Sequence, residues 1–234
     1  MNNKLAQIVS PLVHMLYPHV CCGCGSDVLP ADNLICLDCF NELPHTNYAS
    51  QAGNAVEKIF WGRLNISAAY SEFYFTKGTV VRTLIHELKY RNNIEIGMYL
   101  GTMMGESILK SNRITNIDYL IPLPLFADKQ KKRGYNQAAV ICNGMAQLLN
   151  VPVITGNLIR REATETQTKK HRSERWENVS ESFFVNDRSV LENKNVILVD
   201  DVITTGATIE ACGAELLKIE ELNLTIATVA FASK

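Results

Sequence analysis

Residues 196–208 read VILVDDVITTGAT, and this stretch decides the fold. Its first four residues are apolar and mostly β-branched, which is typical of a strand covered on both faces of a parallel sheet. Two carboxylates, Asp200 and Asp201, end this strand, and a turn rich in Thr and Gly then opens a helix. Ligands of open α/β sheets bind beyond the carboxyl ends of the strands, so we expect the binding site at this point.

The turn after the two acids has the composition of a phosphate site. A helix N-terminus offers unpaired N–H groups, and nearby hydroxyls add further donors for an anion. Gly206 lets the backbone come close to such a ligand. The adjacent carboxylates would repel a phosphate, but they can accept hydrogen bonds from the hydroxyls of a diol. A phosphate beside a diol describes a ribose 5-phosphate.

Other interpretations of this stretch fit less well. A Walker loop requires Gly-Lys-Ser/Thr and a dinucleotide fold requires G-x-G-x-x-G, and neither motif occurs here. Val-Asp-Asp after an apolar strand also opens phospho-acceptor receiver domains, which need most of a domain downstream. Only 33 of the 234 residues follow Asp201. The plainest alternative is a Thr N-cap beside a solvated acidic turn.

The rest of the chain predicts strands that alternate with helices. We expect an α/β fold with a mostly parallel sheet flanked by helices, because apolar strands and amphipathic helices alternate after residue 116. Upstream of this point, the pattern predicts a hairpin and two helices. The expected elements are a hairpin over 66–75, helices over 80–88, 96–108, 138–149 and 208–219, and strands over 118–121, 151–154, 195–200 and 224–231.

The composition of the whole chain is that of a globular protein. Apolar residues make up 47% and charged residues 20%, which excludes disordered, collagen-like and coiled-coil classes. The net charge of -1 excludes a polycation that coats nucleic acid. Since no window reaches about 18 uninterrupted apolar residues, we expect no membrane insertion. The first residues fit a helix better than a signal peptide, so we expect a cytoplasmic protein with reduced thiols.

Five of the seven cysteines lie between residues 21 and 39. Two C-x-x-C pairs, separated by 11 residues, predict a closed structural zinc site formed by Cys21, Cys24, Cys36 and Cys39. The segment has few apolar side chains, so it needs a cross-link such as a bound metal to hold its fold. A redox pair, a register that uses Cys22, and His19 as a substitute ligand are the open alternatives. Cys142 and Cys212 have apolar neighbours and are predicted to be core residues.

The stretch from Asp200 to Thr208 resembles the loop of type I phosphoribosyltransferases that binds phosphoribosyl pyrophosphate (PRPP). The resemblance implies that Asp200 and Asp201 hold the ribose hydroxyls. It also implies that the 5-phosphate binds to the turn formed by Thr204, Thr205, Gly206, Ala207 and Thr208. Mg²⁺ would accompany PRPP, since this ion prefers substrate phosphates and retained waters to an all-protein site.

Further motifs resemble those of the ComF competence proteins. These are IPLPL at 121–125, KKRGYNQ at 131–137, T-x-TQ at 164–167, RWENV at 175–179 and HELKY at 86–90. The resemblance implies an N-terminal helix and zinc knuckle over 1–47 and a phosphoribosyltransferase-like domain over 48–234. Within this domain, hood and connecting elements would occupy 48–115 and the core 116–234. Many ComF relatives carry further Cys pairs, which are missing here after Cys39.

Residues 127–175 hold ten Lys and Arg against four Asp and Glu, a local net charge of +6. A departing pyrophosphate would explain this concentration, with Arg133, Gln167 and Arg175 as candidates on the pyrophosphate side. A groove for single-stranded DNA is the alternative, and the plainest interpretation is a solvated loop. The candidate DNA- or phosphate-binding residues are Lys129, Lys131, Lys132, Arg133 and Tyr135, with Trp176 as a second stacking platform.

These features together predict a ComF-like phosphoribosyltransferase that binds Mg²⁺ and PRPP and is connected with DNA uptake or nucleotide metabolism. Its reaction would transfer phosphoribose to a nitrogen nucleophile. The alternative is a non-catalytic component of the DNA-uptake machinery that binds PRPP or a nucleotide, single-stranded DNA and competence proteins. A third interpretation is an adaptor in which the zinc knuckle binds a partner. The sequence identifies neither the acceptor nor a catalytic base.

Overall fold

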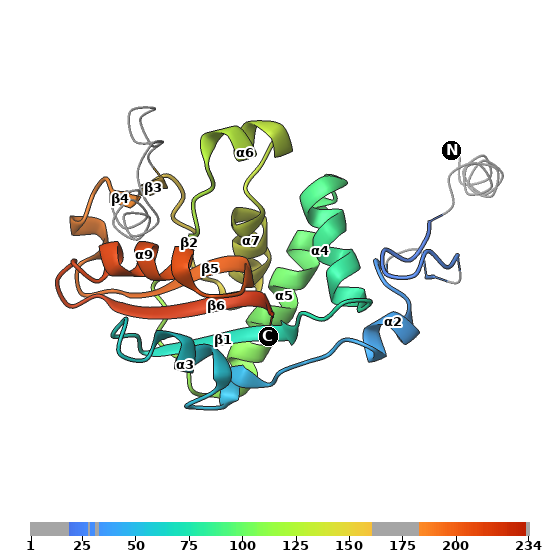
Figure 1. The fold of residues 1–234 in the computed structure, drawn as a ribbon, viewed down its shortest axis with the longest axis horizontal. Coiled ribbons are helices and arrows are strands. Elements are labelled where there is room, and N and C mark those ends of the chain that lie inside the picture. Colours follow the sequence, from blue (N-terminus) through green and yellow to red (C-terminus); the bar gives the residue numbers. More distant parts are fainter. Residues whose placement is uncertain (1–18, 28, 31–32, 161–182, 233–234) are drawn as a thin grey trace, which may run out of the picture.

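The computed structural model describes residues 19–27, 29–30, 33–160 and 183–232. Short helices precede the first strand, and strands and helices alternate from there on (Figure 1). The elements are α2 (Leu37–Asn41), η1 (Tyr48–Ser50), α3 (Ala55–Phe60), β1 (Ala68–Tyr74), α4 (Val80–Tyr90), α5 (Ile94–Ser111), β2 (Tyr119–Pro122), α6 (Ala127–Arg133), α7 (Gln137–Leu149), β3 (Leu158–Arg160), β4 (Phe183–Val185), η4 (Ser189–Leu191), β5 (Asn195–Ile203), α9 (Ala207–Leu216) and β6 (Asn223–Phe231).

Four strands form the main sheet in the order β1-β6-β5-β2, and every neighbouring pair is parallel. Helices α4, α5 and α7 cover one face of this sheet with one apolar core, while α3 and α9 cover the other face with a second core. The sheet between its two helical layers is visible in Figure 1. The predicted α/β fold with a parallel sheet flanked by helices is therefore confirmed.

Helices α5 and α7 cross at very close range. A Cβ atom at Gly101 of α5 would collide with the carbonyl oxygen of Ile141, and one at Gly144 of α7 would collide with that of Met98. Glycine at both positions therefore lets the two backbones touch. The Asn136 side chain accepts a hydrogen bond from the Ala138 N–H and caps the start of α7.

The predicted hairpin over 66–75 is wrong, because these residues form one strand, β1, that runs parallel to β6. Ser71 and Glu72, which were interpreted as a turn, are buried inside this strand. Their polar atoms have partners there: Ser71 is hydrogen-bonded to Thr228 of β6, and a Glu72 oxygen lies 2.9 Å from Nδ1 of His45. Buried polar groups with partners are compatible with a strand.

Other elements differ in extent. The predicted strand at 151–154 is reduced to a single parallel bridge between Leu120 and Val153. Strand β5 continues past Asp200 and Asp201 to Ile203. The two carboxylates therefore belong to the last residues of the strand and do not follow its end. Helices α3 and α6 and the antiparallel pair β3–β4 were not predicted. None of the helices in the described part of the chain has the length and apolarity that crossing a bilayer requires.

Candidate functional site

The side chains of Asp200 and Asp201 on β5 lie on opposite faces of the sheet. Consecutive side chains of a strand alternate between its faces. An Oδ1 atom of Asp201 accepts a hydrogen bond of 2.7 Å from Nζ of Lys89 on α4. Asp200 lies on the other face, within electrostatic range of Arg160 of β3 and Cys212 of α9. The two predicted ribose ligands therefore have different surroundings.

The carboxyl group of Asp200 is a weaker acid than a free aspartate. Burial raises the pKa of its carboxyl to about 8, and the negative charge of Asp201 acts in the same direction. A hydrogen bond of 2.8 Å from the Asp201 N–H to Oδ1 of Asp200, together with the charges of Lys89 and Arg160, opposes this rise in pKa. The net effect favours the protonated form of Asp200.

The turn after β5 forms a hollow at the N-terminus of α9. The residues that line it are Asp200, Val202, Ile203, Thr204, Thr205, Gly206, Ala207, Thr208 and Ile209, which include all five predicted phosphate-binding positions. Gly206 has a φ of 76°, and a Cβ atom there would lie 2.7 Å from Cγ2 of Ile59. Only glycine fits this conformation and this space. The first residues of α9, whose N–H groups have no partner within the helix ladder, therefore line the hollow.

Arg63 supports this turn and was missed by the sequence analysis. Its guanidinium forms an ion pair with Glu210 in the first turn of α9 and donates a hydrogen bond of 3.5 Å to the Thr205 carbonyl. The separation of more than 140 residues between these partners leaves no local signal in the sequence.

The cations of α6 face the end of α4 across a cavity of about 560 Å³, which we call the basic groove. Tyr90 lies in it with 66% of its surface exposed, and the Arg133 guanidinium carbon lies 5.6 Å from the centre of its ring. Arg133 also donates a hydrogen bond of 2.7 Å to Oε1 of Gln137. The lining residues are Lys89, Tyr90, Asn92, Lys129, Lys132 and Arg133.

Two further predicted residues of this region lie differently. Lys131 belongs to α6 but is not part of the lining of the basic groove. Tyr135 is half-buried, its hydroxyl donates a hydrogen bond to the Leu88 carbonyl, and its ring lines a separate pocket. Tyr90, within the HELKY motif, is thus the exposed aromatic residue of the groove. Gln167, Arg175 and Trp176 lie outside the described residues.

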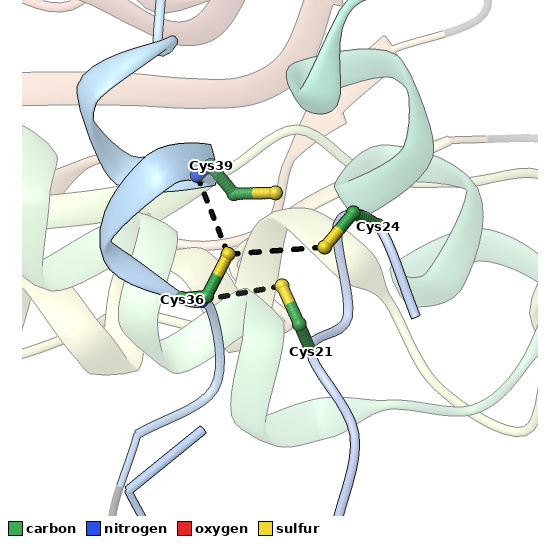
Figure 2. A group of neighbouring side chains, drawn as sticks. All are labelled: Cys21, Cys24, Cys36 and Cys39. Carbon is green, nitrogen blue, oxygen red and sulfur yellow. Dashed lines mark hydrogen bonds between the residues drawn. The ribbon is translucent and has the colours of Figure 1, made fainter. Parts of the chain in front are cut away.

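The four predicted zinc ligands come together (Figure 2). The sulfur atoms of Cys21, Cys24, Cys36 and Cys39 all lie within 4.8 Å of one another. The Cys21 sulfur accepts hydrogen bonds from the N–H groups of Cys36 at 3.2 Å and Gly23 at 3.4 Å. The Cys39 N–H donates to the Cys36 sulfur at 3.5 Å, and four converging thiols in such surroundings fit a tetrahedral structural zinc.

The acidity of Cys21 agrees with a ligand role. Burial alone would raise the pKa of this thiol, but hydrogen bonds from the backbone of Cys24, Cys36 and Gly23 lower it to about 6. This lower pKa favours the thiolate, which is the form that binds metals.

The remaining cysteines have other surroundings. Cys22 accepts a hydrogen bond of 3.5 Å from the Asn93 side chain and is not a member of the four-thiol cluster. Nε2 of His19 lies 2.7 Å from the Asn33 carbonyl oxygen. Cys142 and Cys212 are fully buried, as predicted.

The fold and the turn after β5 define a phosphoribosyltransferase-like protein. The family model of the phosphoribosyl transferase domain matches residues 136–234, from the cap of α7 to the C-terminus. Among solved structures, a glutamine PRPP amidotransferase from B. subtilis, complexed with ADP and GMP, is similar, with a TM-score of 0.43 and 17% identity. This match covers 62% of the present chain and 30% of that much longer one. A hypothetical protein from Neisseria gonorrhoeae with bound ppGpp has a TM-score of 0.39 and 14% identity, and the match covers 73% and 75% of the two chains.

Relatives are more informative than these structures. Competence protein F of Haemophilus influenzae is 26% identical over 219 residues, which is 91% of each chain. The DNA utilization protein YhgH of Escherichia coli K12 is 27% identical over 84% of each chain. Competence protein ComFC of Bacillus subtilis is 34% identical over 62% of this chain and 56% of that protein. These matches support a phosphoribosyltransferase-like protein of the ComF type.

Proposed function

We propose that this chain binds PRPP together with Mg²⁺ at the carboxyl end of β5. One observation carries the proposal: Asp200 and the turn from Thr204 to Thr208 share one hollow at the N-terminus of a ten-residue helix. A helix N-terminus is suited to the 5-phosphate, and the carboxyl groups of Asp200 and Asp201 are suited to the ribose hydroxyls. The match to the phosphoribosyl transferase domain, which spans these residues, supports this assignment.

The reaction that such a site supports is transfer of phosphoribose to a nitrogen nucleophile. A bond forms between this nitrogen and C1 of the ribose, the bond from C1 to the pyrophosphate oxygen breaks, and pyrophosphate leaves with both electrons of that bond. A proton on the attacking nitrogen is lost to solvent. Mg²⁺ would neutralise charge on the pyrophosphate. Arg133, Gln167 and Arg175 are the candidates for contacts with the leaving group.

The cellular role that we propose is a connection with DNA uptake. Its support is the similarity to a competence protein F, to DNA utilization proteins and to a ComFC competence protein. A cytoplasmic location fits this role, because the thiolates of a four-Cys site persist in a reducing compartment.

We also propose that Cys21, Cys24, Cys36 and Cys39 hold one structural zinc. Three of these four residues are buried in the same apolar core as α4, α5 and α7. The ion would therefore join the N-terminal segment to the rest of the fold. Four protein ligands leave no open position for a substrate, which gives this ion a structural role only.

The PRPP site is tested by calorimetry with and without Mg²⁺. We expect Mg²⁺-dependent binding that the double variant Asp200→Ala, Asp201→Ala abolishes, because the ribose hydroxyls lose their acceptors and each such loss costs about 1–3 kcal/mol. The matched control is Asp187→Ala, Glu192→Ala, which removes two exposed carboxylates and should bind PRPP normally. Equal affinity in the parent and the Asp200, Asp201 variant would refute the diol assignment. Pyrophosphate release from PRPP across a panel of bases then tests turnover.

A second candidate function is binding of single-stranded DNA along the basic groove. The observation that favours it is the exposed ring of Tyr90 among Lys129, Lys132 and Arg133. Cations that track the phosphate backbone and an aromatic ring on which a base can stack are the usual parts of such a surface. Lys89 lines the same groove but is paired with Asp201.

The salt dependence of DNA affinity tests this candidate. Three neutralised phosphates imply a slope of log K against log salt near -2, at about -0.7 for each phosphate of a single strand. Replacing Lys129, Lys132 and Arg133 by Ala should flatten this slope, whereas Lys131→Ala, outside the groove, should change it little. Tyr90→Ala should weaken binding by about 1–3 kcal/mol through lost stacking. A DNA signal that does not depend on salt would remove DNA from the function.

A further inference from the structure

A second cavity, of about 490 Å³, lies on the opposite face of α6 from the basic groove. Its walls are mostly apolar and include Pro122, Pro124 and Leu125 after β2, together with Leu158 and Arg160 of β3. We call this cavity the β3 pocket. Its volume is in the range of sites for small organic ligands, and an apolar wall with a few polar groups is typical of them.

Arg160 is the unusual residue of the β3 pocket. Its guanidinium carbon lies 3.5 Å from the centre of the Phe126 ring and 5.0 Å from that of Phe183. Its Nε atom is buried and, among the described residues, has no hydrogen-bond partner. Buried donors almost always have a partner, and an exception points to a missing ligand or water. Burial of the guanidinium also lowers the pKa of Arg160.

Within the part of the chain that the structure describes, the charge of Arg160 has little compensation. Asp200 lies near enough to affect it, but burial raises the pKa of Asp200, which makes this carboxyl a weaker partner for a cation. Asp201 is turned to the other face, where it is paired with Lys89. The neighbouring Cys212 thiol is buried and its pKa is raised well above the usual value, so it is neutral. Among the described residues Arg160 forms no ion pair, and a cation without a counter-ion favours an anionic ligand.

We propose that the β3 pocket binds the nitrogen acceptor of the reaction, a planar heterocycle that carries a carboxylate, and that Arg160 holds this carboxylate. The inference rests on the proposed phosphoribosyl transfer. A guanidinium presents two parallel N–H groups that match a carboxylate, and the flanking Phe rings fix its plane. The apolar walls suit a flat ring. Pyrophosphate carries the same anionic chemistry, but a multiply charged group with Mg²⁺ is better matched by the exposed cations of α6.

The test compares a ring that carries a carboxylate with a neutral form of the same ring. With the full-length protein, Mg²⁺ and PRPP, calorimetry measures the affinity of nicotinate against nicotinamide, and of orotate against uracil. We expect at least one acid to bind about 10-fold or more tightly than its neutral partner, since hydrogen bonds between a guanidinium and a carboxylate are stronger than those between neutral groups. Arg160→Gln should remove this preference and leave the affinity for PRPP unchanged. The exposed Arg82→Gln is the matched control and should keep both properties.

Three outcomes would overturn the inference. One is that neither acid binds better than its neutral partner. Another is that Arg160→Gln keeps the preference for the acid. The third is that the affinity of Arg160→Gln for PRPP falls as much as its affinity for the acid, which would show that the anion held there is pyrophosphate. If Arg160→Gln does not fold, Arg160→Lys replaces it: this variant keeps the charge, loses the paired N–H groups, and should reduce the preference for the acid while PRPP still binds. Failure of PRPP binding in the parent protein would count against the proposed function itself.

Discussion

The ion pair between Lys89 and Asp201 joins α4 to the end of β5 and lends itself to a quantitative test. Its N–O distance is 2.7 Å, and the two side chains are only 20% and 12% exposed. Asp201 is also one of the two proposed ribose ligands. Its preference for Lys89 in the absence of PRPP therefore affects both stability and binding.

The expected coupling energy follows from the burial of this pair. At an effective dielectric constant of about 20, two charges about 4 Å apart attract by about 4 kcal/mol. Desolvation and the ordering of the lysine side chain offset more than half of this attraction. We therefore expect a net coupling of about 1.5 kcal/mol between Lys89 and Asp201.

A double-mutant cycle measures this coupling. The free energy of unfolding in urea is determined for the parent, Lys89→Met, Asp201→Asn and the double variant. The exposed pair of Lys110 and Glu106, with a distance of 3.2 Å, is the matched control and should couple by less than about 0.5 kcal/mol. Added salt should weaken the control pair more, because buried pairs are screened less. If Lys89 and Asp201 couple no more strongly than the control, the argument from burial is wrong.

Two further predictions concern the zinc site and Asp200. Purified protein should contain one zinc per chain by metal analysis; Cys36→Ser should empty the site while Cys22→Ser leaves it filled, and metal loss in Cys22→Ser would show the other register. Asp200→Asn should stabilise the fold more near pH 8.5 than near pH 6.5, because burial raises the pKa of the native carboxyl from 3.8 to about 8 and the native carboxyl then holds its proton where the unfolded one has lost it. The stability of the parent thus falls as the pH rises between these values; a gain of equal size at both pH values in thermal unfolding would contradict this reasoning.

Sequence patterns predicted the elements whose cause is local. The apolar run before Asp200 predicted β5, and the helical spacing of apolar residues predicted α4, α5 and α7. The four ligands of the cysteine cluster followed from two C-x-x-C pairs, because each knuckle fixes two thiols by its own turn. The turn after β5 was predictable for the same reason, since Gly206 has to adopt a positive φ.

Features that depend on distant partners were not predictable. Ser71 and Glu72 look like a turn until Thr228 and His45 supply their hydrogen bonds. The pairing of Lys89 with Asp201 joins residues 112 positions apart, and neither residue signals the other. The orientation of each carboxylate was also hidden, because it follows from the extension of β5 to Ile203.

The end of β5 connects two binding regions, and this arrangement has a consequence for DNA binding. Asp200 faces the side of Arg160 and the turn, whereas Asp201 holds Lys89, which lines the basic groove. Both Asp200→Ala and Asp201→Ala should lower the affinity for PRPP. Only Asp201→Ala frees the Lys89 ammonium, which can then neutralise one more phosphate and steepen the salt slope for single-stranded DNA by about -0.7. An unchanged slope in Asp201→Ala, or the same change in Asp200→Ala, would show that Lys89 does not link the ribose site to the groove.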